Sequence, residues 1–102
     1  MKRYIANYTI VPHQGIFINH IITLDDNGML IGLKPADEEL AYTIYVPGTN
    51  VLVPQAFSKS LTQLINGLTT RHDIYSALTE ATKPYDLHTQ PLSVLTMGLI
   101  TD

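Results

Sequence analysis

The sequence predicts a single α+β domain, in which a mainly antiparallel β-sheet or small β-sandwich is followed by two or three helices. Three observations carry this prediction. Apolar residues alternate with polar ones through most of residues 3–54, and from Phe57 onward they recur at helical spacing. An Asn27-Gly28 pair between two apolar runs predicts a hairpin, because both residues tolerate a positive φ. At 102 residues the chain is long enough for one modest core. We therefore expect about five short strands in a β-rich part, residues 1–54, and a mainly helical part, residues 55–102.

The first two strands are expected over residues 3–11 and 15–24. The first ends at Pro12, and its period of two places on one face Tyr4, Ala6, Tyr8 and Ile10. The second places on one face Ile16, Ile18, His20, Ile22 and Leu24. Its other face is also half apolar, which is typical of a strand covered on both sides by a sheet, by helices or by a second subunit.

The hairpin can close in two ways. A two-residue turn at Asn27-Gly28 sets Leu24 opposite Ile31 and Ile22 opposite Leu33. A four-residue turn over residues 25–28 sets Leu24 opposite Met29 and Ile22 opposite Ile31. Both registers keep the same apolar faces together. Two further strands are expected over residues 40–46 and 51–53, separated by a turn at Pro47-Gly48-Thr49-Asn50 and ended by Pro54.

The second half of the chain has helical periodicity. One helix is expected from Phe57 to about Gly67. A second is expected over residues 71–82, where Thr70 can cap the helix N-terminus and Pro84 ends the helix. The tail, residues 89–101, fits either a helix carrying leucines at helical spacing or a strand, and we favour the helix.

Composition limits the possible partners. Six basic residues are scattered through a chain of net charge −3, so no basic stripe exists for nucleic acid. No apolar run approaches the length of a membrane span, and the N-terminus lacks the apolar block of a signal peptide. The chain has no cysteine, and we expect a cytoplasmic location. With 45% hydrophobic and only 15% charged residues, it is expected to bury apolar surface against a partner, as a homo-oligomer (most simply a dimer) or with another protein.

The order of features in the first half matches a known pattern. A first strand is followed by a Gly-led strand, Gly15-Ile16-Phe17-Ile18, a hairpin of the Asp-Asp-Asn-Gly type and a further β segment. Two later segments have the character of a strand ending in a Pro-Gly-Phe motif: Tyr45-Val46-Pro47-Gly48 and Val51-Leu52-Val53-Pro54. Over about residues 2–56, this order resembles the N-terminal segment of the amidohydrolase superfamily, the metal-dependent hydrolases. The resemblance implies strands of the small composite β-sandwich that lies beside the catalytic barrel.

The chain departs from that family where catalysis would begin. In the enzymes this strand leads into a His-x-His pair that binds the metal, whereas here Ser60 and Thr62 stand at the expected positions. Neutral hydroxyls are poor ligands for Zn²⁺. The barrel, which needs about 250 residues, does not fit in this chain. The resemblance therefore implies a non-catalytic domain with no catalytic residues, no metal site and no cofactor.

Other candidate sites are few. The histidines, His13, His20, His72 and His88, lack the spacing of a local metal pair. His20 interrupts an apolar strand face, so we expect it to be half-buried and bonded to backbone or to a partner chain, with ligand binding as the alternative. Tyr42 and Tyr45 are the other candidate ligand or interface residues. The acidic turn at residues 25–28 lacks the oxygen ligands of a calcium loop and is explained by turn chemistry.

We expect the domain to act through protein–protein association, by itself or as an accessory to another protein. The alternative is a small-molecule site between sheet and helices, with His20 and tyrosines as polar anchors. An enzyme would require at least two histidines to converge with a carboxylate within hydrogen-bonding distance.

Overall fold

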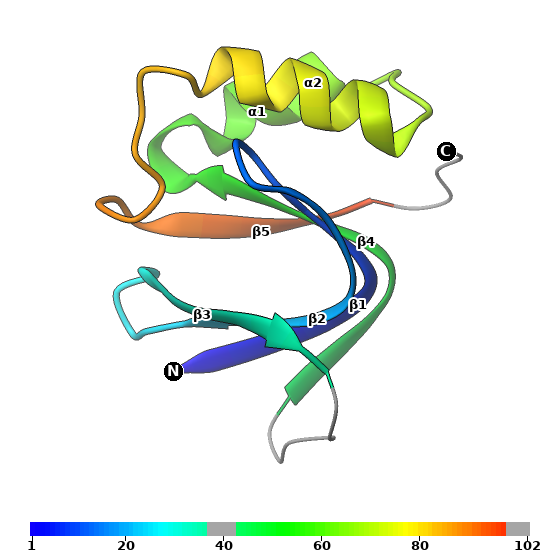
Figure 1. Ribbon diagram of the computed structural model, residues 1–102. Coiled ribbons are helices and arrows are strands. Elements are labelled where there is room, and N and C mark those ends of the chain that lie inside the picture. Colours follow the sequence, from blue (N-terminus) through cyan, green and yellow to red (C-terminus); the bar gives the residue numbers. More distant parts are fainter. Residues whose placement is uncertain (37–42, 98–102) are drawn as a thin grey trace.

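The computed structural model describes residues 1–36 and 43–97. Its strands are β1 (Lys2–Val11), β2 (Gly15–Leu24), β3 (Leu30–Pro35), β4 (Thr43–Pro54) and β5 (Leu92–Met97), and its helices are a short 3-10 turn (Gln55–Phe57), α1 (Ser58–Ile65) and α2 (Arg71–Ala81). The strands form one sheet in the order β3-β2-β1-β4-β5, antiparallel except for the β1–β4 pair (Figure 1). The predicted α+β class with a mainly antiparallel sheet is confirmed.

The sheet is strongly curled. Figure 1 shows β1, β2 and β4 bending together, with β3 and β5 at the two ends of the curl and both helices on its outer side. α1 contacts β4, and α2 contacts β1 and β2. The bend coincides with backbone irregularities on adjacent strands. Asn19 of β2 has φ 51°, and the β1–β4 register shifts between Ala6 and Tyr8, beside Gly48 with φ 111°. Bulges of this kind bend a sheet and increase its twist.

The irregularity on β4 corrects one prediction. Pro47-Gly48 does not form a turn between two strands; it is a bulge within the single strand Thr43–Pro54. The Gly48 N–H donates to Asn7 Oδ1 on β1 at 3.4 Å. Proline and glycine mark bulges as well as turns, and the parallel pairing with β1 on both sides of the bulge keeps the strand continuous. Residues 40–42 of the predicted strand lie outside the described residues.

Two cores form, one on each face of the sheet. The helix-side core, between the sheet and both helices, consists of Ile10, Val51, Val53, Leu61, Ile65, Ile74 and Leu78. The inner core, inside the curl, consists of Val11, Ile22, Leu24, Leu52, Leu87 and Leu92. The bend splits both predicted strand faces: Tyr4 packs against the inner core and Ile10 lies in the helix-side core, although they share a parity along β1.

The β2–β3 hairpin forms, and Ile22 lies opposite Leu33, as the two-residue-turn register predicts. A register shift between Thr23 and Leu24 then sets Leu24 opposite Leu30 in place of Ile31. The loop is a turn from Asp25 to Gly28, closed by a Gly28 N–H to Asp25 carbonyl bond of 3.0 Å. Gly28 has φ 85°, as expected of a three-residue loop that ends in a left-handed glycine. Asp25 Oδ1 also accepts the Asn27 and Met29 N–H groups, at 2.8 and 2.9 Å. The acidic stretch is therefore turn chemistry.

The favoured helix in the tail is wrong. Residues 92–97 form β5, antiparallel to Thr49–Pro54 of β4. Its side chains alternate between the cores, since Leu92 lies in the inner core while Leu95 packs against the helix-side core. The leucine spacing fits either a helix or a strand, and pairing with β4 selects the strand. The end of the predicted helix, residues 98–101, lies outside the described residues.

The two predicted helices are confirmed. Leu61 and Ile65 of α1 and Ile74 and Leu78 of α2 are buried, and the Thr70 side chain caps α2 by accepting the Asp73 N–H. In the described part of the chain, neither helix has the length and hydrophobicity needed to cross a membrane.

Candidate functional site

The β2–β3 hairpin and β5 are joined by a main-chain hydrogen bond that closes one end of the curl. The Leu92 N–H donates to the Gly28 carbonyl at 2.8 Å, and Gln55 Nε2 donates to the Leu92 carbonyl at 3.3 Å. Both polar groups of the Leu92 backbone are therefore used on the side of β5 that faces away from β4. This contact anchors the first residue of β5.

Along the rest of that outer edge, no other strand pairs with β5 among residues 1–36 and 43–97. The Gln55 N–H donates to the Pro91 carbonyl at 3.0 Å, so the ladder of β4 uses the backbone of odd-numbered residues along β5. The N–H and C=O groups of Val94 and Thr96 consequently point away from β4. Within the described chain these groups have no backbone partner, since β5 ends the sheet. Two residues of β5 thus present a complete donor and acceptor pair each.

The two edges of the sheet differ in their protection. β3 contains a register shift between its pairs with Thr23 and Leu24, and it ends in Lys34 and Pro35. Bulges, lysine and proline all hinder the addition of another strand to an edge. β5, with the sequence LSVLTM, has no charge, no proline and no register shift. It is the unprotected edge.

Exposed apolar side chains do not mark a separate patch. Ile18, Ile31 and Leu64 are exposed by 62%, 57% and 46%, but they lie on β2, β3 and α1. Single exposed apolar residues are common on protein surfaces. They identify no interface by themselves.

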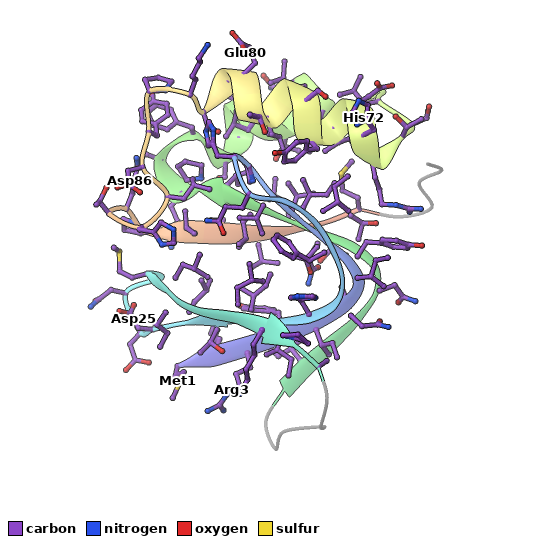
Figure 2. All side chains as sticks on the ribbon, viewed as in Figure 1. Met1, Arg3, Asp25, His72, Glu80 and Asp86 are labelled. Carbon is purple, nitrogen blue, oxygen red and sulfur yellow. The ribbon has the colours of Figure 1, made fainter. Side chains whose placement is uncertain are left out.

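Two histidines line one cleft. The β1–β2 turn, residues 12–14, and the loop at residues 85–88 enclose a cavity of about 270 Å³ that includes His13, Asp86 and His88. Figure 2 shows Asp86 on this loop at one end of the molecule and His72 at the far end of α2. His20 lies on β2 and does not line this cleft. The four histidines therefore do not converge.

The polar groups of the cleft are engaged in structural contacts. His13 Nε2 lies 3.1 Å from the Thr82 carbonyl and 3.0 Å from Thr82 Oγ1. A carbonyl only accepts, so this nitrogen is the donor, and it ties the β1–β2 turn to the C-terminus of α2. Gln14 Nε2 is 3.2 Å from His88 Nε2, and Asp86 Oδ1 accepts the His88 main-chain N–H at 2.9 Å.

The described histidine rings do not pair with carboxylates. Across residues 1–36 and 43–97, no histidine ring is hydrogen-bonded to a carboxylate. Among the same residues, no group of three histidine or acidic side chains is arranged to hold a metal ion. The cleft provides neither a general base paired with an acid nor a ligand set.

Charged groups outside the cleft also have structural roles. Arg71, the first residue of α2, is 8% exposed, and its guanidinium carbon lies 3.6 Å from the centre of the Tyr8 ring. Stacking over an aromatic face stabilises a partly desolvated arginine. At the hairpin, the Met1 amino group forms an exposed ion pair with Asp26. The hydrogen bond and charge of this amine lower the pKa of the Asp26 carboxyl.

Of the predicted site residues, the structure describes the side chain of His20. His20 is half-buried; its Nδ1 lies 2.9 Å from the Ile18 carbonyl and its ring is 4.9 Å from that of Phe17. Tyr42 and the side chain of Tyr45 lie outside the described residues. Core side chains fill the described sheet–helix interface, and the cleft lies at its margin.

Comparison with protein-family models, curated proteins and solved structures finds no match to this chain. The resemblance to amidohydrolases rests on the residues alone.

The open edge of β5 could not be predicted from the sequence, because it depends on contacts between distant residues. Which backbone groups of β5 face outward depends on its register with β4 and on the distant Gly28 contact. Neither is encoded in the local pattern of residues 92–97. A usable signal was the uncharged stretch itself, which is typical of strands that accept another strand.

Proposed function

We propose that this domain acts by binding protein through the outer edge of β5, as a non-catalytic association module. The single observation that carries the proposal is the unprotected edge, where Val94 and Thr96 offer free backbone donors and acceptors on an uncharged strand. An extended segment that adds to such an edge gains main-chain hydrogen bonds, and its alternate side chains contact both faces of the sheet.

The surroundings of the edge support this proposal. Leu95 and Val94 are half-buried on opposite faces of the sheet, so an added strand would complete the cover of both cores at that edge. The hairpin contact at Leu92 fixes one end of the strand, which presents the free groups in a defined orientation. Burial of these half-exposed side chains favours association by about 25 cal/mol per Å² before the entropic cost of binding.

A resemblance to the composite domain of amidohydrolases is part of the same proposal. It is supported by the order of β1, the Gly15-led β2, the hairpin at residues 25–28, β3, and β4 ending at Pro54. Ser60 and Thr62, at the positions of the metal-binding histidines, lie on α1. Serine and threonine hydroxyls offer no zinc site, so association rather than hydrolysis is the function proposed.

Site-specific photo-crosslinking tests the proposal. A benzophenone amino acid is placed at Thr96, at the β5 edge, and in a matched control at Ile31, which is similarly exposed on the protected β3 edge. In the cells that express the chain, we expect a discrete protein adduct at position 96 and none at position 31. Adducts at position 31 alone, or at neither position, would overturn the assignment.

A further inference from the structure

We infer that the strand added to β5 is the β5 of a second copy of this chain, paired antiparallel about a twofold axis at Leu95. This inference rests on the proposed function. It names the partner from the backbone groups, the charges and the side chains of the edge itself.

The free backbone groups are complementary to themselves. In an antiparallel pair centred on Leu95, Val94 lies opposite Thr96 of the partner subunit, and Thr96 lies opposite the partner's Val94. Residues facing each other in this way exchange both their N–H···O=C bonds, so four hydrogen bonds form and every free group on the edge is used. Such an interface is isologous, as in most homodimers.

A register shifted toward the N-terminus of β5 uses fewer of these groups. Sliding the second strand by two residues toward the N-terminus of β5 brings a free residue opposite Leu92. The Leu92 N–H is already bound to the Gly28 carbonyl and its C=O to Gln55. Of these two registers, the one centred on Leu95 therefore satisfies more of the described edge.

Charge and side chains favour a second copy. Residues 92–97 carry no charge, so two copies meet there without like charges opposite each other, although each chain has a net charge of −3. Leu95 would face Leu95 of the partner subunit on the helix side of the sheet. That side chain is half-buried in one chain, and the pair would cover its remaining surface.

The first test removes one outward N–H. Thr96→Pro deletes a donor that the β4 ladder does not use, so the chain retains its own sheet. Thr96→Val is the matched control, because both variants lose the bond from Thr96 Oγ1 to Asn50 Oδ1, but only proline loses the N–H. Light scattering over a concentration series should show a dimer for the wild type and for Thr96→Val. For Thr96→Pro, the dissociation constant should rise on the order of 10-fold or more.

The second test fixes the register. Directly opposed residues of a non-hydrogen-bonded pair lie about 4.5 Å apart at Cα, within disulfide range. The chain has no cysteine, so Leu95→Cys introduces a single thiol, and under oxidised glutathione it should form a disulfide-linked dimer. Should that variant fail to fold, Val94→Cys and Thr96→Cys should cross-link when mixed, and neither should cross-link with itself.

The possible outcomes distinguish a failure of self-pairing from a failure of the proposed function. A wild type that stays monomeric, with no cross-link at position 95 or between 94 and 96, overturns self-pairing. If photo-crosslinking at Thr96 then captures a different protein, association through β5 stands and only the identity of the partner fails. A dimer that forms equally well with Thr96→Pro and cross-links at none of these positions overturns self-pairing through β5. If photo-crosslinking at Thr96 also captures no protein, association through β5 is overturned as well.

Discussion

The Leu92 N–H donates a 2.8 Å hydrogen bond to the Gly28 carbonyl, and this bond joins the hairpin at one end of the sheet to the strand at the other. Gly28 also lies close against β5. A Cβ at this position would be 2.9 Å from Gln55 Nε2, the end of a flexible side chain, and 3.3 Å from the Leu92 carbonyl oxygen. A side chain at position 28 would therefore crowd the contact that closes the curl.

We predict that Gly28→Ala lowers the free energy of unfolding by about 2 kcal/mol, because alanine must adopt a left-handed φ and must displace its neighbours. Gly67→Ala is the matched control. Gly67 has φ +96°, close to the +85° of Gly28, but nothing lies within 4 Å of its hypothetical Cβ. Urea denaturation of both variants separates the two contributions. Equal losses in the two variants would show that the Leu92 contact adds nothing to the cost.

The sequence predicted the features that depend on neighbouring residues in the chain. Asn27-Gly28 produced a turn, and Thr70 followed by Asp73 produced a helix cap. Pro47-Gly48 did not produce the predicted turn, because the same residues fit a bulge once β1 pairs on both sides of them. The tail became a strand for the same reason, since its partner on β4 selects between two structures that its leucines allow. The open β5 edge depends on these long-range pairings, and so it was found only in the fold.

The cap of α2 gives a second prediction. Thr70 Oγ1 accepts the Asp73 N–H at 3.1 Å, which satisfies one of the free donors at the helix N-terminus. Thr70→Ala should lower the free energy of unfolding by about 1 kcal/mol, whereas Thr70→Asp retains an acceptor and should be close to the wild type. Thermal and urea unfolding followed by circular dichroism measure both. A Thr70→Asp variant as unstable as Thr70→Ala would attribute the loss to packing and not to the cap.

The ion pair between Met1 and Asp26 predicts a titration. The neighbouring amino group lowers the pKa of Asp26 from its ordinary value of 3.8. A carboxyl whose pKa is lowered by folding contributes stability above its unfolded pKa and loses it as the pH falls through the folded value. Carboxyl chemical shifts of the 102-residue chain should show Asp26 titrating below 3.8, and acetylation of the amine should move the midpoint back upward.

Ionic strength provides the control for that titration. Both groups are exposed, so added salt should screen their attraction and should also raise the Asp26 pKa. The unmodified and acetylated chains should then converge. An Asp26 pKa that responds to neither acetylation nor salt would exclude the amine as its cause.

A buried polar pair in the curl gives the last prediction. Thr9 and Asn50 lie opposite each other on β1 and β4, and both are fully buried. Thr9 Oγ1 and Asn50 Nδ2 have no hydrogen-bond partner in the described part of the chain. A buried hydroxyl without a partner loses its hydrogen bonds to water and gains none in the folded protein, which destabilises the fold. Thr9→Val keeps the branched shape and removes the hydroxyl, so it should raise the free energy of unfolding by about 1 kcal/mol.

Thr49→Val, at a buried threonine one residue from Asn50 on β4, serves as the comparison, because its hydroxyl is not among the unpartnered atoms. Urea denaturation should show Thr9→Val as the more stable of the two variants. A loss of stability in Thr9→Val would mean that its hydroxyl is satisfied in solution, by a buried water or by the amide of Asn50.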